Sequence, residues 1–210
     1  MRRMTTIAVA ALVFAVAGCG LKATVPPRLD LGEFETIGII DFECSNEGEL
    51  GPYATTKFIE WIRRDQGMVR IVELGSEEEL LEELGLAKLG KEAFEELAEM
   101  HGLYTVITGE LTIFDVRPDI TIAPGFGFMD FSAEVDAVMS VRLVEAETGA
   151  SLWSNSAQAT RRVAGVSIFG RSSFAFDARD PEEAYGELVE ALVKKTSRDF
   201  RETWEWRCCP

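Results

Sequence analysis

Short apolar runs and amphipathic segments alternate along the chain. The apolar runs at 36–42, 68–72 and 103–109 predict three strands. Apolar residues recur at helical spacing over 53–66, 76–84 and 91–101, and a glycine follows each of these segments. Asp180 and Pro181 begin a further amphipathic helix that continues to Phe200. This order predicts an α/β fold of the α+β sandwich type, with helices packed on a mixed sheet and an amphipathic helix near the carboxyl end.

The longest regular pattern is a strict apolar–polar alternation over two arms. The first arm runs from Phe114, on the apolar face, to Ile122, and its polar positions are Asp115, Arg117, Asp119 and Thr121. The second arm runs from Met129 to Leu143, with polar positions that include Asp130, Ser132, Glu134, Asp136 and Ser140. Each arm reaches the roughly 9–11 residues that a transmembrane β-strand needs. The alternation fits either a membrane hairpin or a hairpin with one face on a core.

Two details constrain the membrane interpretation. Pro118 lies within the first arm and predicts a sheet edge or a bend, because proline donates no ladder hydrogen bond. A lone hairpin leaves unpaired edges, so spanning a bilayer requires several copies that close one barrel. A second, shorter alternation predicts another hairpin, and the two extensions cover about 114–140 and 161–179.

The amino-terminal segment has the features of a secretion signal. Arg2 and Arg3 precede an apolar run over 7–18, which ends in Val16-Ala17-Gly18-Cys19. This ending resembles the lipobox of bacterial lipoproteins, which implies cleavage between Gly18 and Cys19 and lipid attachment at Cys19. Gly20 then resembles the sorting pattern for the periplasmic face of the outer membrane. The alternative is an ordinary secretory signal followed by a coincidental cysteine.

These signals divide the chain into three parts. Residues 1–18 are a predicted signal peptide, 19–35 a lipid-anchored tether with an extended Pro26-Pro27 pair, and 36–210 a single domain. The remaining cysteines are Cys44, Cys208 and Cys209, and their pairing is open.

Charge and composition exclude several classes of function. The 210 residues carry a formal charge of −15, which becomes −17 when Arg2 and Arg3 are removed. Nucleic acid is not an expected partner, because phosphate binding needs clustered lysine and arginine side chains. Because there is one histidine, His101, we expect neither a two-histidine metal site nor a histidine-based triad. No enzyme, metal or cofactor is predicted, although a hydrolase with carboxylates gathered by the fold is a distant third reading. The acids at 73–99 are expected to form a solvated helix face.

Two segments carry a family resemblance. Val106-Ile-Thr-Gly-Glu110, and the hairpin that runs from Val141-Arg-Leu-Val through Glu147-Thr-Gly149 to Leu152-Trp153, resemble the CsgG family of curli-secretion lipoproteins. They also resemble the TolB amino-terminal domain and the lipoprotein activators of penicillin-binding proteins. The CsgG resemblance implies a ring-shaped homo-oligomer whose hairpins close one barrel, with lumenal acids at Asp115, Asp119, Asp130, Glu134 and Asp136.

The sequence therefore predicts an outer-membrane lipoprotein that acts in export or assembly of envelope or extracellular material, with secreted protein as cargo and a secretion channel as its oligomeric form. The alternative is a monomeric periplasmic lipoprotein that docks on an envelope or cell-wall partner protein, as the TolB-like and activator relatives imply. In both cases the membrane is contacted through the lipid anchor.

Overall fold

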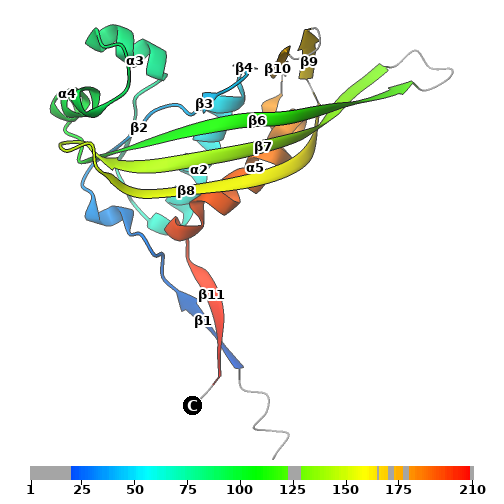
Figure 1. Ribbon diagram of the computed structural model, residues 1–210. Coiled ribbons are helices and arrows are strands. Elements are labelled where there is room, and N and C mark those ends of the chain that lie inside the picture. The colour runs from blue at the N-terminus through cyan, green and yellow to red at the C-terminus, as the bar shows by residue number, and fades with distance from the viewer. Residues whose placement is uncertain (1–19, 123–128, 165, 170–172, 177–179, 209–210) are drawn as a thin grey trace, which may run out of the picture.

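The computed structural model describes residues 20–122, 129–164, 166–169, 173–176 and 180–208 (Figure 1). Its strands are β1 (Gly20–Val25), β2 (Ile37–Ile39), β3 (Glu43–Cys44), β4 (Glu47–Gly48), β5 (Ile71–Glu73), β6 (Thr105–Ile122), β7 (Met129–Glu145), β8 (Ser151–Ala164), β9 (Val166–Phe169), β10 (Ser173–Phe176) and β11 (Thr203–Cys208). Its helices are α2 (Leu50–Gln66), α3 (Glu77–Leu84), α4 (Lys91–His101) and α5 (Pro181–Thr196), with short 3₁₀ turns η1 (Leu31–Glu33) and η2 (Ser197–Phe200).

The central sheet is mixed, as predicted. Its strand order is β5-β2-β6-β7-β8, in which β2 runs parallel to β5 and β6 whereas β7 and β8 are antiparallel additions. Gly149 has a φ of 72° in the turn between β7 and β8, which is the turn role predicted for it. The predicted α+β class is confirmed.

Helices cover both faces at one end of the sheet. On one face α2 and α5 bury the main core, with Phe58 and Leu192 packed against Ile107 and Leu143 of the sheet. On the other face α3 and α4 bury a smaller core around Leu97 and Val106. Ser76 caps the start of α3, because its hydroxyl accepts a hydrogen bond from the Glu79 amide.

The first predicted hairpin is confirmed as β6 and β7, which extend beyond the rest of the sheet (Figure 1). One detail of the prediction is wrong. The register shifts between Ile113 and Asp115, so Phe114 is a bulge residue that is 63% exposed instead of lying on the apolar face. The predicted alternation holds beyond the bulge, where Val116 and Val135 pair and are both buried.

The second predicted hairpin is present in part as a separate unit. Strands β9 and β10 pair antiparallel, and β10 also pairs with β4. Arg161 and Arg162, placed in this hairpin by the prediction, instead continue β8 and pair with β7.

The segment predicted as a tether contains ordered structure. Strand β1 pairs with β11 in a two-stranded ribbon, which runs from Val25 opposite Thr203 to Gly20 opposite Cys208 and projects from the body (Figure 1). Leu31 is fully buried in the main core. Gln66, at the end of α2, fixes the base of the ribbon, because its amide donates to the carbonyls of Leu29 and Phe200.

Candidate functional site

The structure brings three of the five predicted lumenal acids around one arginine. Arg117 Nη2 lies 2.7 Å from Glu134 Oε1 and 2.8 Å from Asp136 Oδ2, and its Nε lies 3.7 Å from Asp115 Oδ2. We call these four residues the hairpin charge cluster. Because the cluster contains a cation, its acids are partly neutralised, whereas the prediction considered only the acids.

The other two predicted acids lie further out on the hairpin. Asp119 pairs in register with Ser132, and Asp130 pairs with Thr121. Their side chains lie outside the part of the molecule that the structure describes.

The apolar face of the same arms is buried by the chain itself. Val116, Ala133, Val135 and Ala137 belong to the main core, together with Val163 of β8. Up to Val116 and Ala133, therefore, the alternation reflects a core-facing sheet, which was one of the two open interpretations. The described outer backbone of the two arms, 119–122 and 129–132, pairs in register.

The outer hairpin and strand β8 differ in how their edges are treated. Among the described strands, β6 after Leu111 pairs only with β7, and residues 129–131 of β7 pair only with β6. On β8, by contrast, Lys195 Nζ donates to the Gln158 carbonyl at 2.6 Å and Arg161 donates to the Thr160 carbonyl at 2.7 Å. Side chains thus occupy backbone groups of β8, which discourages strand addition there. On β6 the Ser45 hydroxyl likewise accepts a hydrogen bond from the Ile113 amide at 3.0 Å, so the open edge of the hairpin begins beyond Ile113.

A second site, not predicted, lies at the carboxyl end of β2. The chain leaves β2 through α2 to reach β5 on one side, and returns through α3 and α4 to β6 on the other. Such a switch point leaves a crevice, which is where open α/β sheets bind ligands. Here an open cavity of about 470 Å³ is lined by five acids, namely Asp41, Glu43, Glu77, Glu78 and Glu110.

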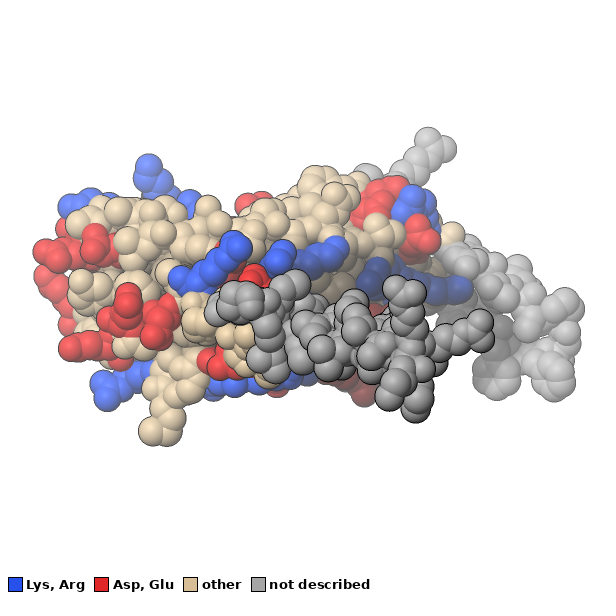
Figure 2. Space-filling view, turned by 90° about the horizontal axis from the view of Figure 1, so that it is seen from below, with Lys and Arg blue, Asp and Glu red and all other residues tan. Residues whose placement is uncertain are grey.

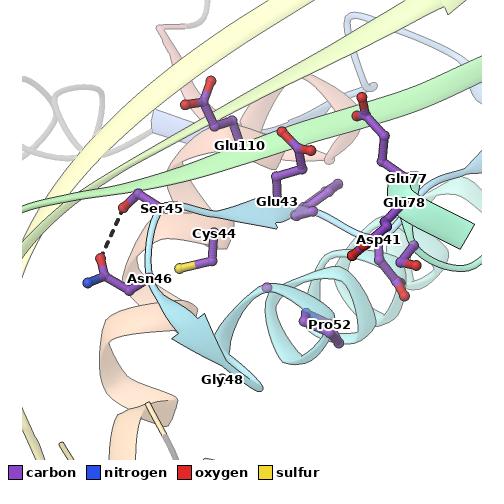
Figure 3. A pocket seen from close by; sticks show the side chains of 13 residues that line it. Asp41, Glu43, Cys44, Ser45, Asn46, Gly48, Pro52, Glu77, Glu78 and Glu110 are labelled. Carbon is purple, nitrogen blue, oxygen red and sulfur yellow. Dashed lines mark hydrogen bonds between the residues drawn. The ribbon is translucent and has the colours of Figure 1, made fainter. Parts of the chain in front are cut away.

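The carboxylates of this acidic crevice come from four elements or loops. Figure 3 shows Glu43, Glu77 and Glu110 on one side of β3 and the Cys44 thiol on the other. Burial raises the pKa of Asp41, and the nearby Glu73 and Glu79 raise it further. Burial likewise raises the pKa of Glu77, with Glu43 adding to the effect and Arg142 opposing it. The crevice is therefore an electronegative surface that favours cations over anions.

The sequence offered one signal for this crevice. Glu77 and Glu78 were assigned to a solvated helix face, but they line the crevice at the start of α3. The signal was Asp41, a polar residue that comes soon after a buried strand. Ligand sites of open α/β sheets lie at the carboxyl ends of such strands. Among the described residues, no group of acid, histidine or cysteine side chains is arranged to hold a metal ion.

The predicted lipid site lies just outside the described residues. Gly18 and Cys19 precede Gly20, the first residue of β1. Cys44 is a free thiol that is half-buried, and burial raises its pKa. Cys208 lies in β11 opposite Gly20, and Cys209 falls outside the described residues. Within the described part of the chain, no helix has the length and apolar character needed to cross a membrane.

Comparison with known proteins gives similarities of fold. No family model and no curated protein matches the chain. Among solved structures it is similar to the PelC dodecamer from Paraburkholderia phytofirmans, with 14% identity, 87% of this chain and 97% of that chain covered, and a TM-score of 0.46. It is also similar to the lipoprotein GNA1162 from Neisseria meningitidis, with 18% identity, 60% and 83% covered, and a TM-score of 0.38.

A third similar structure is the LpoB carboxyl-terminal domain from Salmonella enterica, with 13% identity, 64% of this chain and 84% of that chain covered, and a TM-score of 0.38. Lipoproteins are thus among the structures that the chain is similar to. Membership of the CsgG family specifically stays a prediction.

Proposed function

We propose that this chain is a lipid-anchored lipoprotein of the outer membrane that assembles copies of itself through the β6–β7 hairpin. The oligomer acts in export or assembly of envelope or extracellular material by binding, without covalent chemistry. The observation that carries the proposal is the open edge of the hairpin beyond Ile113, on strands that are 18 and 17 residues long. Long unpaired edges are stabilised by pairing with another strand, and a second copy supplies one.

A secretion channel is the specific form of this proposal. In that form the outer hairpins close one barrel, and Asp115, Glu134 and Asp136 face its lumen together with Arg117. Asp119 and Asp130 extend the same polar face toward the tip. Because Arg117 neutralises part of the charge, we expect a weaker preference for cations than acids alone would give.

One observation favours the alternative, a monomeric docking lipoprotein. The chain buries the apolar face of Val116, Ala133 and Val135 without help from a second copy. In that case the open hairpin edge receives a strand of a partner protein in the envelope.

The test is the particle size of the acylated protein, extracted in mild detergent and imaged by electron microscopy. A matched variant shortens the hairpin: Asn-Gly replaces residues 118–133 and joins Arg117 to Glu134, which are register partners. We expect rings from the natural chain and monomers from the shortened one. Monomers from both would reject the oligomer and favour docking, and rings from both would place the assembly surface elsewhere.

A further inference from the structure

The two ends of the chain meet in the β1–β11 ribbon, and this fixes where the ribbon must lie. Gly20 pairs with Cys208 at the tip, and the predicted lipid-bearing Cys19 is the residue directly before Gly20. Consecutive Cα atoms are 3.8 Å apart, so lipid chains on Cys19 hold the ribbon tip at the bilayer surface. This step rests on the proposed lipid anchoring.

The ribbon carries an exposed aromatic side chain suited to that position. Trp204 is 58% exposed, and the Lys22 ammonium lies 5.0 Å from the centre of its ring. Trp206 lies two residues closer to the tip and pairs in register with Lys22. Tryptophan favours the membrane–water interface, because its ring is apolar while its N–H needs a polar partner. A two-stranded ribbon is marginal in water, so a surface that covers it stabilises it.

The ribbon base differs in charge from the rest of the molecule. We define it as the ribbon together with the segments at its foot, residues 20–28, 63–66 and 197–208. The Gln66 side chain links these segments, because it donates hydrogen bonds to the carbonyls of Phe200 and of Leu29, the residue directly after the first segment. These segments hold seven basic and four acidic residues, whereas the chain without its predicted signal carries −17. Figure 2, viewed from the side on which the ribbon projects, shows basic side chains along the middle of this face and acidic ones toward its two ends.

Two of the four acids of the ribbon base are paired with arginines. Asp65 pairs with Arg201 at 3.0 Å, and Asp199 lies 3.6 Å from Arg28. Arg63 and Arg198 are exposed, and within the described residues neither forms an ion pair of this kind. Although the net charge is negative, the charges are separated along the molecule, and the side nearest the predicted anchor is basic.

From these observations we infer that the ribbon and its base form a membrane-contact surface. Trp204 inserts among the lipid headgroups, and Arg63 and Arg198 attract anionic lipid. The ribbon thereby lies against the bilayer and fixes the orientation of the body, instead of leaving it on a loose tether.

The test uses the acylated full-length mature protein in vesicles of equal parts phosphatidylcholine and phosphatidylglycerol, with bromine on the phosphatidylcholine acyl chains. Bromine quenches tryptophan fluorescence at contact. We expect quenching in the natural protein and its loss in Trp204→Phe/Trp206→Phe. That variant retains Trp61 and Trp153, which belong to the body and report that it is folded.

A charge-reversed variant tests the basic residues. In Arg63→Glu/Arg198→Glu the ratio of docked to undocked ribbon, measured from the fraction quenched, should fall by about thirtyfold. The matched control, Lys88→Glu/Lys91→Glu, makes the same change in net charge on the acidic α3–α4 region and should leave the quenching unchanged.

Each outcome has a distinct meaning. Natural protein that does not float with the vesicles would overturn the lipid anchoring and the proposed function with it. Protein that floats, but shows equal fluorescence with and without bromine, would overturn the membrane-contact surface alone. Equal effects of the two charge reversals would reject the basic residues as its headgroup contacts.

Discussion

The inner and outer halves of the β6–β7 hairpin follow the same apolar–polar alternation but lie in different surroundings. The inner half, up to Ile113, is covered on one face by α2 and α5, and α3 and α4 cover the other face where the strands begin. The outer half is covered on one face by the chain's own core only as far as Val116 and Ala133. The same apolar–polar alternation can therefore occur in one strand both where the strand faces the core and where it extends beyond the core.

The polar faces of the two halves differ as well. Beside the inner half, Glu43, Glu77 and Glu110 gather in the acidic crevice, where the pKa of Glu77 is raised. On the outer half, Arg117 balances its acidic neighbours. Local charge therefore opposes folding in the crevice and supports pairing on the outer arm.

The largest expected effect comes from removing core volume in the inner half. Met139 is fully buried, pairs in register with the buried Leu111, and receives a weak hydrogen bond from Thr196 at 3.7 Å. Met139→Ala should lower the free energy of unfolding by about 2–5 kcal/mol, measured by urea denaturation.

The control for this variant is the neighbouring residue on the open face. Ser140 donates a hydrogen bond to Ser156 at 3.0 Å. Ser140→Ala should cost only about 0.5–1.5 kcal/mol, because water can reach the partner hydroxyl. Equal losses at the two positions would contradict the difference between the two faces.

A smaller loss is expected where α2 and β6 are linked through Phe42. A Cβ atom at Gly109 would lie 2.5 Å from the Phe42 ring, which is fully buried. Gly109→Ala should therefore destabilise the protein by about 1–3 kcal/mol in the same assay. The double variant with Phe42→Leu should recover part of this loss, and strictly additive losses would argue against the contact.

On the outer half, a charge removal should have a modest effect. Arg117 is 51% exposed, so its ion pairs are screened by solvent, and Arg117→Gln should cost less than about 1 kcal/mol. Thermal unfolding at low and high salt checks the cause, since the loss should shrink as salt weakens repulsion among Asp115, Glu134 and Asp136. A loss that does not depend on salt would point to packing of the arginine stem.

The smallest effect is expected in the acidic crevice, and it depends on pH. The folded state raises the pKa of Glu77 above its ordinary value of 4.5, so it binds this proton more tightly than the unfolded chain does. Ionisation of Glu77 therefore lowers stability as pH rises above that value.

Glu77→Gln removes this cost. It should raise the free energy of unfolding slightly at pH 7, by less than about 0.5 kcal/mol because solvent screens the site, as measured by thermal unfolding. The gain should vanish near pH 4, where the native carboxyl is protonated. A larger gain in acid than at neutral pH would reverse the assigned direction.

The sequence by itself determined the local elements, because their signals lie within a few residues. Ser76 and Glu79 mark the start of α3, Gly102 follows the end of α4, and the alternation after Phe114 marks the arms of the hairpin. The strand and helix order was sufficient for the α+β class. The lipobox ending in Cys19 stays a prediction, and its pattern likewise lies within adjacent residues.

Only the tertiary structure decided which residues from distant segments meet. The ribbon joins Gly20 to Cys208, and the acidic crevice joins Asp41 to Glu77 and Glu110. Arg117 meets Asp136 only because the two arms pair in one register, and the bulge at Phe114 shifts that register by one residue. Such contacts depend on how the helices pack on the sheet. The periodicity of the sequence predicts which side chains share a face of a strand or helix, but it does not predict which distant segment covers that face.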